Sequence, residues 1–355
     1  MTVPPLSTIG IIGGGQLGRM LAMAAAQLGY RCHIFAPDAR SPAAEVSYAW
    51  TQAGYDDLEA LTRFAESVDI VTYEFENIPV EPVRAISGTR TVAPNPKALE
   101  IAQDRALEKS FVDSLGARTA PWSRIDTIEA LREAIDRIGY PAILKTRRNG
   151  YDGKGQARLN QAGDVEAAWQ AIGGQSAILE GFVSFQHEFS IIIARGASGE
   201  TVAWDPPENV HRDGILDLSS LPPDPVIVEQ AEEARLLAAR VAEELDYVGV
   251  LTLEFFAAAD GPVLNEMAPR VHNSGHWTIE GAVTSQFENH IRAICGLPLG
   301  SPALTAPRIE MRNLIGEQAN DWQDYLSDPA VHLHLYGKHV PRAGRKMGHL
   351  TKLFD

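Results

Sequence analysis

The stretch that decides the fold is Asn-Glu-Met-Ala-Pro-Arg-Val-His-Asn-Ser-Gly-His, residues 265–276. It starts inside an apolar strand predicted over 262–267, in which Glu266 is the acidic residue. A dense set of hydrogen-bond donors, suited to holding a small oxyanion, follows: Arg270, His272, Asn273 and Ser274. Because no G-x-S-x-G turn is present, a Ser/His/Asp hydrolase is disfavoured. The segment predicts anion binding beside a carboxylate, with a purely structural role as the alternative.

A second apolar strand, predicted over 248–256, carries Glu254. Ala259-Asp260-Gly261 is a hairpin signal, and a turn centred there makes Glu254 and Glu266 near neighbours across the two strands. Two buried carboxylates side by side are costly unless a cation lies between them. The pair therefore predicts a Mg²⁺ site shared with phosphate oxygens, the alternative being two ordinary glutamates on an exposed sheet face.

A lysine, Lys145, ends the predicted strand 142–145 and is followed by a cationic, glycine-containing loop. Glycine lets the backbone close over phosphate oxygens, and cations neutralise them. A triphosphate is the ligand that this pattern favours over a merely solvated basic loop. The loop residues that we expect at the phosphates are Gly150, Tyr151, Asp152, Gly153, Lys154, Gly155 and Gln156.

The N-terminal ~100 residues alternate predicted strands (8–12, 31–35, 69–72 and 91–93) with helices (17–28, 57–66 and 79–86). This rhythm predicts a doubly wound parallel sheet, Rossmann-like in type. Gly13 to Gly18 match G-x-G-x-x-G between the first strand and its helix. Three interpretations stay open: a structural glycine turn, a site for a substrate phosphate or carboxylate, or NAD(P) binding. The last is disfavoured because Asp38 comes late for a ribose contact.

The remaining chain predicts an α+β organisation. We expect helices over 97–115, 128–138 and 226–245, and strands over 155–159, 177–179, 189–194 and 201–204. A smaller, more polar module is expected after Gly296-Leu297-Pro298. This module carries basic residues that form either a phosphate clamp or a solvated basic tail: Lys338, Arg342, Arg345 and Lys346.

Composition limits the class of partner. The chain has 355 residues and a formal net charge of −15, which disfavours nucleic acid and anionic membranes as its main ligands. Its apolar runs are too short to span a bilayer, and its first residues carry no basic targeting segment. Cys32 and Cys295 lie in apolar segments and predict two buried thiols. We therefore expect a cytoplasmic protein.

Taken together, these motifs resemble the ATP-grasp superfamily and, within it, the N5-carboxyaminoimidazole ribonucleotide synthetase family. Besides 265–276, the segments that carry the resemblance are Gly-Gly-Gln-Leu-Gly-Arg-Met (14–20), Tyr-Glu-Phe-Glu-Asn (73–77), Gly-Tyr-Asp-Gly-Lys-Gly-Gln (150–156) and Gly-Arg-Lys-Met-Gly-His (344–349). The resemblance implies a pre-ATP-grasp domain (1–100), small and large ATP-grasp subdomains (101–182 and 183–297) and a small C-terminal domain (298–355).

The resemblance also implies roles for individual residues. Besides the loop 150–156, the implied ATP contacts are Arg105, Lys145, Glu180, Gly181, Phe182, Val183, Glu188, His211, Asn265 and Glu266. Glu254 and Glu266 are implied as the metal ligands. The implied ribonucleotide contacts are Gly15, Gln16, Leu17, Glu76, Tyr151, Lys154, Lys338 and Arg345, with Asp152 orienting the amine. Bicarbonate is implied to bind Arg270, His272, Asn273 and Ser274.

By the same resemblance, the expected reaction is the carboxylation of 5-aminoimidazole ribonucleotide with bicarbonate and ATP, through carboxyphosphate, in purine biosynthesis. It requires Mg²⁺, or Mn²⁺ in its place. A homodimer and a hand-over of the product to the mutase that acts next are the expected associations. The alternatives are a ligase like the formate-dependent glycinamide ribonucleotide transformylase, one like biotin carboxylase, and an NAD(P)-dependent dehydrogenase.

Overall fold

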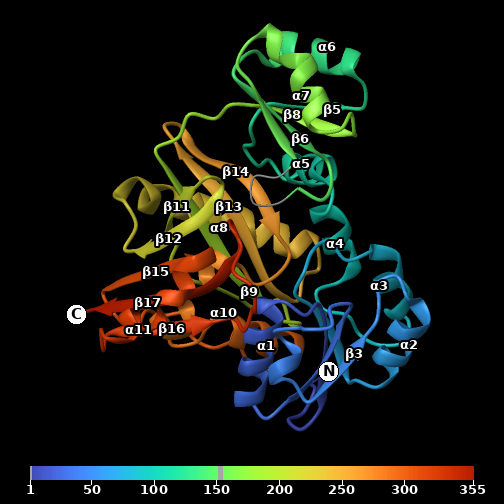
Figure 1. The fold of residues 1–355 in the computed structure, drawn as a ribbon, viewed down its shortest axis with the longest axis vertical. Coiled ribbons are helices and arrows are strands. Elements are labelled where there is room, and N and C mark those ends of the chain that lie inside the picture. The colour runs from blue at the N-terminus through green and yellow to red at the C-terminus, as the bar shows by residue number, and fades with distance from the viewer. Residues whose placement is uncertain (1, 151–154) are drawn as a thin grey trace.

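The computed structural model describes residues 2–150 and 155–355 (Figure 1). The N-terminal domain is a parallel sheet in the order β3-β2-β1-β4. Its strands are β1 (Thr8–Ile12), β2 (Arg31–Ala36), β3 (Ala49–Gln52) and β4 (Ile70–Tyr73). Helix α1 (Gln16–Gln27) packs on one face, and α2 (Leu58–Glu66) and α3 (Val80–Ile86) pack on the other. The doubly wound prediction is confirmed, although 91–93 contributes a single bridge, between Val71 and Val92, where we predicted a strand.

Two capped helices lead out of this domain. Asn95 caps α4 (Pro96–Ala102), and Asp104 caps α5 (Arg105–Ser114) by accepting from the N–H groups of Ala106 and Leu107. The small subdomain that follows is an antiparallel sheet in the order β5-β8-β6-β7. It consists of β5 (Trp122–Ile125), β6 (Ala142–Thr146), β7 (Gln156–Leu159) and β8 (Ala177–Gly181), packed against α6 (Ile128–Ile138) and α7 (Val165–Ala171).

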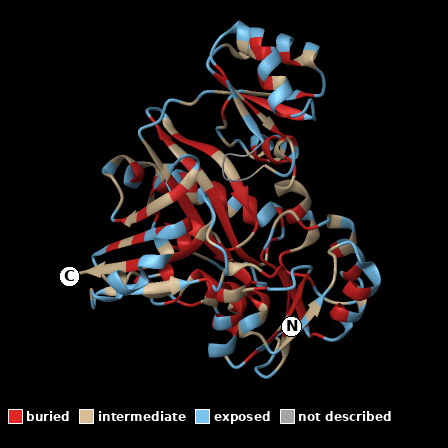
Figure 2. Cartoon of the chain, in the orientation of Figure 1, coloured by how far each residue is buried: buried red, intermediate tan, exposed pale blue. Residues whose placement is uncertain are grey.

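A nine-stranded sheet forms the centre of the molecule, with the path β14-β13-β9-β11-β12-β15-β17-β16 and β10 paired to β9. Its first six strands are β9 (His187–Arg195), β10 (Thr201–Ala203), β11 (Glu208–Arg212), β12 (Ile215–Leu221), β13 (Gly249–Ala258) and β14 (Gly261–Ala268). Alternate apolar side chains of β9 and β13 face opposite sides. One side packs on α8 (Pro225–Glu244), and the other packs on α10 (Gln286–Ile294) and α1. Figure 2 shows the resulting buried band along these strands.

The C-terminal strands continue this same sheet. β15 (Arg308–Ile315) pairs with β12 and with β17 (Lys346–Phe354), and β16 (Val331–Leu335) forms the edge. Two short helices, α9 (Thr278–Gly281) and α11 (Trp322–Leu326), flank these strands. The polar module that we predicted after residue 298 is therefore attached to the large subdomain by main-chain hydrogen bonds.

Cys32 and Cys295 are both buried thiols outside any disulfide in the described chain, as predicted. No helix within residues 2–150 and 155–355 is long and apolar enough to cross a membrane.

Candidate active site

The two glutamates of the central hairpin lie directly opposite each other. Glu254 of β13 pairs in register with Glu266 of β14, beside a bulge, which confirms the arrangement predicted from the turn at Asp260-Gly261. Each carboxylate has its own side-chain partner: His272 Nε2 lies 3.0 Å from Glu254 Oε1, and Arg105 Nη1 lies 3.3 Å from Glu266 Oε2. Burial raises the pKa of Glu254, but His272, together with His211 and Lys346, more than offsets this, and the net shift is downward. The hairpin therefore presents two carboxylates side by side, each with a partner from outside the hairpin.

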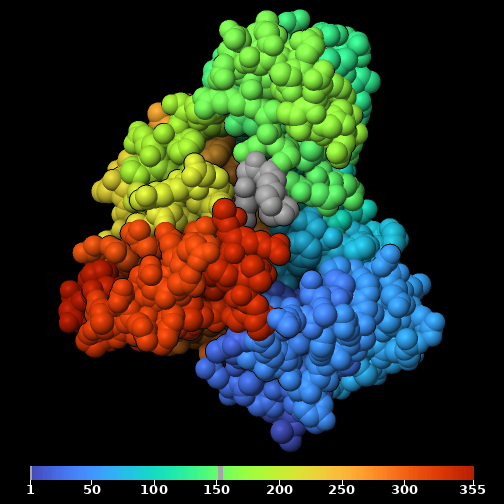
Figure 3. Space-filling view, in the orientation of Figure 1, coloured from blue at the N-terminus to red at the C-terminus, as the bar shows by residue number. Residues whose placement is uncertain are grey.

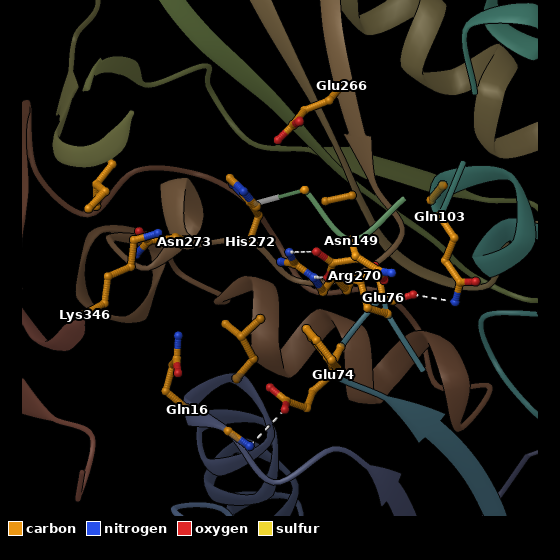
Figure 4. Close-up of a pocket in the computed structure, with 18 of the residues that line it drawn as sticks. Gln16, Glu74, Glu76, Gln103, Asn149, Glu266, Arg270, His272, Asn273 and Lys346 are labelled. Atoms are coloured by element: carbon orange, nitrogen blue, oxygen red, sulfur yellow. Dashed lines mark hydrogen bonds and ion pairs between the residues drawn. The ribbon is translucent and has the colours of Figure 1, made fainter. Parts of the chain in front are cut away.

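An ion pair connects the N-terminal domain to the segment after β14. Arg270 donates through Nη2 to Glu76 Oε1 at 2.9 Å and through Nε to Glu76 Oε2. Figure 4 shows these two side chains face to face, with Gln103 donating to the main-chain oxygen of Glu76. Burial raises the pKa of Glu76, but Arg270 holds that pKa below its usual value. The pairing restricts the rotation of the guanidinium of Arg270, a residue that lines the cavity.

The donors that follow Arg270 hold one another in place. His272 Nδ1 lies 2.9 Å from Ser274 Oγ, which leaves Nε2 directed at Glu254. The side chains of Asn273 and Asn313 exchange two hydrogen bonds, at 2.9 and 2.8 Å, and Asn313 also donates to Leu216 O. Ser274 is fully buried, and Asn273 is nearly so. Arg270 and His272 therefore have the more direct access to a bound anion.

Lys145, the residue before the last of strand β6, lies beside the buried carboxylate of Glu180, on β8. Its Nζ lies 2.5 Å from Glu180 Oε2, while Lys109 Nζ lies 3.0 Å from Oε1. Burial raises the pKa of Glu180, but the two lysines outweigh that effect and bring it to about 2. This triad links helix α5 to the sheet of the small subdomain.

Sequence reasoning missed Lys109 and its neighbour Glu108. Lys109 also donates to the carbonyl of Asn265 at 2.9 Å, and Glu108 accepts from the N–H of Met267. Burial raises the pKa of Glu108 to about 8. A signal was present, since these residues lie three and four positions after Arg105, on the same face of α5.

Three other candidate ATP contacts lie on or next to strands β8, β9 and β11. His211 Nδ1 on β11 lies 2.9 Å from Glu188 Oε2 on β9. Burial lowers the pKa of His211, but Glu188 and Glu254 raise it overall. Phe182, just beyond β8, is exposed and lies under the guanidinium of Arg158, with 4.9 Å between the guanidinium carbon and the ring centroid. An exposed aromatic ring next to a strand end suits stacking against a base.

The glycine turn after β1 is occupied by a side chain of its own domain. Gly15 and Gly18 donate their N–H groups to Glu74, at 2.9 and 3.2 Å. Gly13 has φ +116°, and a Cβ there would lie 2.5 Å from Glu74 Cγ, so the turn requires glycine. Burial raises the pKa of Glu74. Glu74, which the sequence analysis did not select, thus fills part of the turn, and Gly15, Gln16 and Leu17 lie at the rim of the cavity.

A cavity of about 740 Å³ collects residues from three parts of the chain. In Figure 3 the N-terminal domain, the small subdomain and the C-terminal segment border the same central region of the molecule. Lys338 donates to the carbonyl of Lys346 at 2.6 Å, and Arg345 donates to that of Val340 at 2.9 Å. The predicted site residues that line the cavity are Gly15, Gln16, Leu17, Glu76, Arg105, Gly150, Glu266, Arg270, His272, Asn273, Lys338 and Arg345.

The remaining predicted residues lie elsewhere. Lys145 and Glu180 belong to the buried triad with Lys109. Glu254, Glu188 and His211 lie on β13, β9 and β11, the three strands that come after β14 in the sheet. Ser274 is buried beneath His272. The predictions for Tyr151, Asp152, Gly153 and Lys154 fall outside the described residues.

Three family models match successive parts of the chain. A ribonucleotide synthetase preATP-grasp domain matches residues 6–103, an ATP-grasp domain matches 110–287, and a phosphoribosylaminoimidazole carboxylase C-terminal domain matches 310–355. Fold and site together define an ATP-grasp enzyme, a nucleotide-binding ligase.

Proteins of similar sequence and structure show to which family of ATP-grasp enzymes the chain belongs. N5-carboxyaminoimidazole ribonucleotide synthase of Brucella melitensis is 51% identical, over 99% of this chain and 98% of its own length. The enzyme of the same name from Bacillus subtilis is 42% identical, over 98% of this chain and 91% of its own length. The solved synthetase of Thermus thermophilus superposes with a TM-score of 0.91 at 47% identity, covering 98% of this chain and 94% of that one. The chain belongs to the N5-carboxyaminoimidazole ribonucleotide synthase family, which removes the dehydrogenase alternative.

Solved relatives also carry ligands. An ADP complex of an N5-carboxyaminoimidazole ribonucleotide synthetase has a TM-score of 0.96 at 42% identity, covering 100% of this chain and 94% of that one. A synthase from Aspergillus clavatus, in complex with ADP and 5-aminoimidazole ribonucleotide, has a TM-score of 0.92 at 29% identity, covering 98% of this chain and 94% of that one.

Proposed function

We propose that this chain carboxylates 5-aminoimidazole ribonucleotide with bicarbonate and ATP, giving N5-carboxyaminoimidazole ribonucleotide, ADP and phosphate in purine biosynthesis. The observation that carries the proposal is the single cavity in which Glu266, Arg270, His272, Lys338 and Arg345 meet, in a chain that belongs to this family. Arg270, Lys338 and Arg345 bring positive charge to the place where anionic substrates must be held in a chain of net charge −15.

The reaction has two steps. An oxygen of bicarbonate attacks the γ-phosphorus of ATP and displaces ADP, which gives carboxyphosphate. The exocyclic amine of the ribonucleotide then takes the carboxyl carbon, losing a proton, and phosphate leaves. Because phosphoryl transfer depends on position and charge, Lys145 and Arg105 act by neutralising the transferred group. Arg270, anchored by Glu76, holds the bicarbonate oxyanion in line.

The phosphate of the ribonucleotide is assigned to Lys338 and Arg345, whose cations border the cavity. Gly15, Gln16, Leu17 and Glu76 are assigned to the same substrate, as are Tyr151 and Lys154, with Asp152 orienting its amine. ATP is assigned to the following residues: Lys145, Gly150 to Gln156, Glu180, Gly181, Phe182, Val183, Glu188, His211 and Asn265. Asn273 and Ser274 support the bicarbonate site from beneath.

Mg²⁺, or Mn²⁺ in its place, is assigned to Glu254 and Glu266. Within the described residues no three His, Cys, Asp or Glu side chains form a metal cluster. Two carboxylates in register suit Mg²⁺, which usually takes one or two protein carboxylates and completes its shell with phosphate oxygens and water. When bound, the ion draws charge from the phosphate oxygens.

We further propose the domain boundaries 1–100, 101–182, 183–297 and 298–355, a cytoplasmic location, and a homodimer. Hand-over of the product to the mutase that acts next belongs to the same proposal, since a carbamate formed on an amine is labile.

ADP release by the purified protein, with Mg²⁺, ATP and bicarbonate, tests the function. Stimulation that requires both bicarbonate and 5-aminoimidazole ribonucleotide supports it. Stimulation by formate with glycinamide ribonucleotide, or by biotin with bicarbonate, would instead assign one of the other ATP-grasp reactions. ATP binding without stimulation by any acceptor would contradict all three.

A further inference from the structure

A glutamine outside the motifs holds the main chain of His272. Gln286 is the first residue of α10, and its side chain is fully buried. Its Oε1 accepts from the N–H of His272 at 2.9 Å, and its Nε2 donates to the carbonyl of the same residue at 2.6 Å. One side chain thereby satisfies both main-chain polar groups of a residue at the reaction centre.

The geometry of His272 explains why this contact matters. Its backbone is extended, with φ −129° and ψ 154°, yet it lies outside every strand of the described chain. An extended residue within an antiparallel ladder would exchange two hydrogen bonds with the residue opposite. The amide of Gln286 takes the place of that missing strand, because it pairs with both the N–H and the C=O of His272.

The surrounding segment is shaped to admit this side chain. A Cβ on Gly275 would lie 2.7 Å from Gln286 Cδ and 2.6 Å from Ile192 Cδ1, so a larger residue there would collide with both. The main-chain N–H of Gln286 donates to Thr278 Oγ1 at 3.0 Å, and Thr278 donates to Gly275 O at 2.6 Å. The start of α10 thus fixes both ends of the turn 272–278.

The ring of His272, on a main chain held in this way, has a partner at each nitrogen. Nδ1 meets Ser274 Oγ and Nε2 meets Glu254 Oε1. Arg270 lies two residues earlier and is held by Glu76. Gln286 therefore acts through His272 on the place where the bicarbonate oxyanion and the carboxylate pair meet.

We propose that Gln286 is a positioning residue for carboxylation, which acts by clamping the main chain of His272. The kinetic test of this inference rests on the proposed function. Gln286→Met keeps the length of the side chain and removes both hydrogen bonds. We expect kcat to fall about 100-fold, as for a misplaced reacting group, while KM for ATP stays within about threefold.

Gln286→Glu gives a second readout that a general loss of structure would not produce. An ionised glutamate can accept from His272 N but repels His272 O, whereas the protonated acid can donate to it. Burial raises a carboxyl pKa. The titratable group facing this position is His276, whose Nδ1 lies 3.4 Å from Gln286 Nε2 and whose own pKa burial holds well below its usual value. The ratio of Gln286→Glu activity to wild-type activity should rise as pH falls, while the Gln286→Met ratio should stay flat.

Gln230→Met is the matched control, because Gln230 also donates its amide to a main-chain oxygen, that of Ala258, away from the cavity. Amide hydrogen exchange at His272 supplies a readout without substrates, with protection expected to be lost in Gln286→Met and kept in the control.

Near-wild-type kcat together with retained protection in Gln286→Met would overturn the inference. If that variant fails to fold, the pH-dependent ratio of Gln286→Glu decides, and a flat ratio would overturn it. Absence of acceptor-dependent ADP release in the wild type would refute the proposed function, while the exchange readout would still test the clamp.

Discussion

Arg270 and Glu76 lie 194 residues apart in the chain and form a two-point ion pair, with Nη2 and Oε1 2.9 Å apart. The pair crosses from the N-terminal domain to the segment that follows β14. It sets the direction of the guanidinium and, at the same time, holds two domains together around the cavity. Its loss should therefore affect both stability and catalysis.

Glu76→Ala tests the structural part of that statement. Removing one partner of a largely buried pair leaves an uncompensated charge, so we expect the free energy of unfolding to fall by about 3 kcal/mol. Urea denaturation followed by circular dichroism measures it. The control is Glu81→Ala, because Glu81 pairs with Arg84 at an exposed surface and its loss should cost under about 1 kcal/mol. Equal losses in the two variants would show that Arg270 does not depend on Glu76.

Glu266→Gln should leave the fold intact, because the carboxylate is 43% exposed. It should lower turnover by about 100-fold or more and raise the Mg²⁺ concentration needed for half-maximal ADP release, since an amide is a weaker ligand for a hard cation. A Mg²⁺ titration of activity gives both values. Glu233→Gln, on the exposed face of α8, serves as the control. Turnover near the wild-type value would remove Glu266 from the metal site.

Lys109→Met should raise KM for ATP about tenfold. Glu180 would then form its ion pair with Lys145 alone, and Lys145 would be less available to bind phosphate. The double variant Lys109→Met/Glu180→Gln should be less impaired than the sum of the single variants. Lys97→Met is the control, since Lys97 also donates to a main-chain carbonyl, at the surface. Additive effects of the two substitutions would show that Lys109 and Glu180 act separately.

His290 should make the protein less stable in acid. Its Nε2 lies 2.8 Å from Thr72 Oγ1 and its Nδ1 accepts from Val250 N at 3.1 Å, and burial lowers its pKa from 6.5 to about 3. Because the unfolded chain takes up this proton near pH 6.5 and the folded chain only near pH 3, the contribution to stability is complete above 6.5. It is lost as pH falls between those values, by up to about 1.4 kcal/mol per pH unit.

Denaturation curves between pH 7 and pH 4.5 measure that slope. His290→Gln can keep both contacts without taking up a proton. Its free energy of unfolding should therefore change less with pH, by up to about 1.4 kcal/mol per pH unit, which is the contribution of one proton. The exposed His332→Gln should leave the slope at the wild-type value. Identical slopes for wild type and His290→Gln would contradict the assignment.

Features set by short stretches of sequence were predictable. The hairpin at Asp260-Gly261 determined that Glu254 and Glu266 face each other, because a tight turn sets the register of its own strands. The alternation of strands and helices predicted the parallel N-terminal sheet, and the helix expected over 226–245 is α8. These depend on local geometry and period, which the sequence carries directly.

The partners of the charged groups were decided only by the tertiary structure. The expectation that a metal alone relieves the Glu254–Glu266 repulsion was incomplete, since His272 and Arg105 already partner these carboxylates. Glu74 at the glycine turn, Lys109 at Glu180 and Gln286 at His272 all meet residues distant in the chain. The sequence by itself determined the family, the hairpin and the candidate chemistry. Which side chains hold those groups in place depended on how the domains pack, because a buried charge or amide takes its partner from whatever element the fold brings against it.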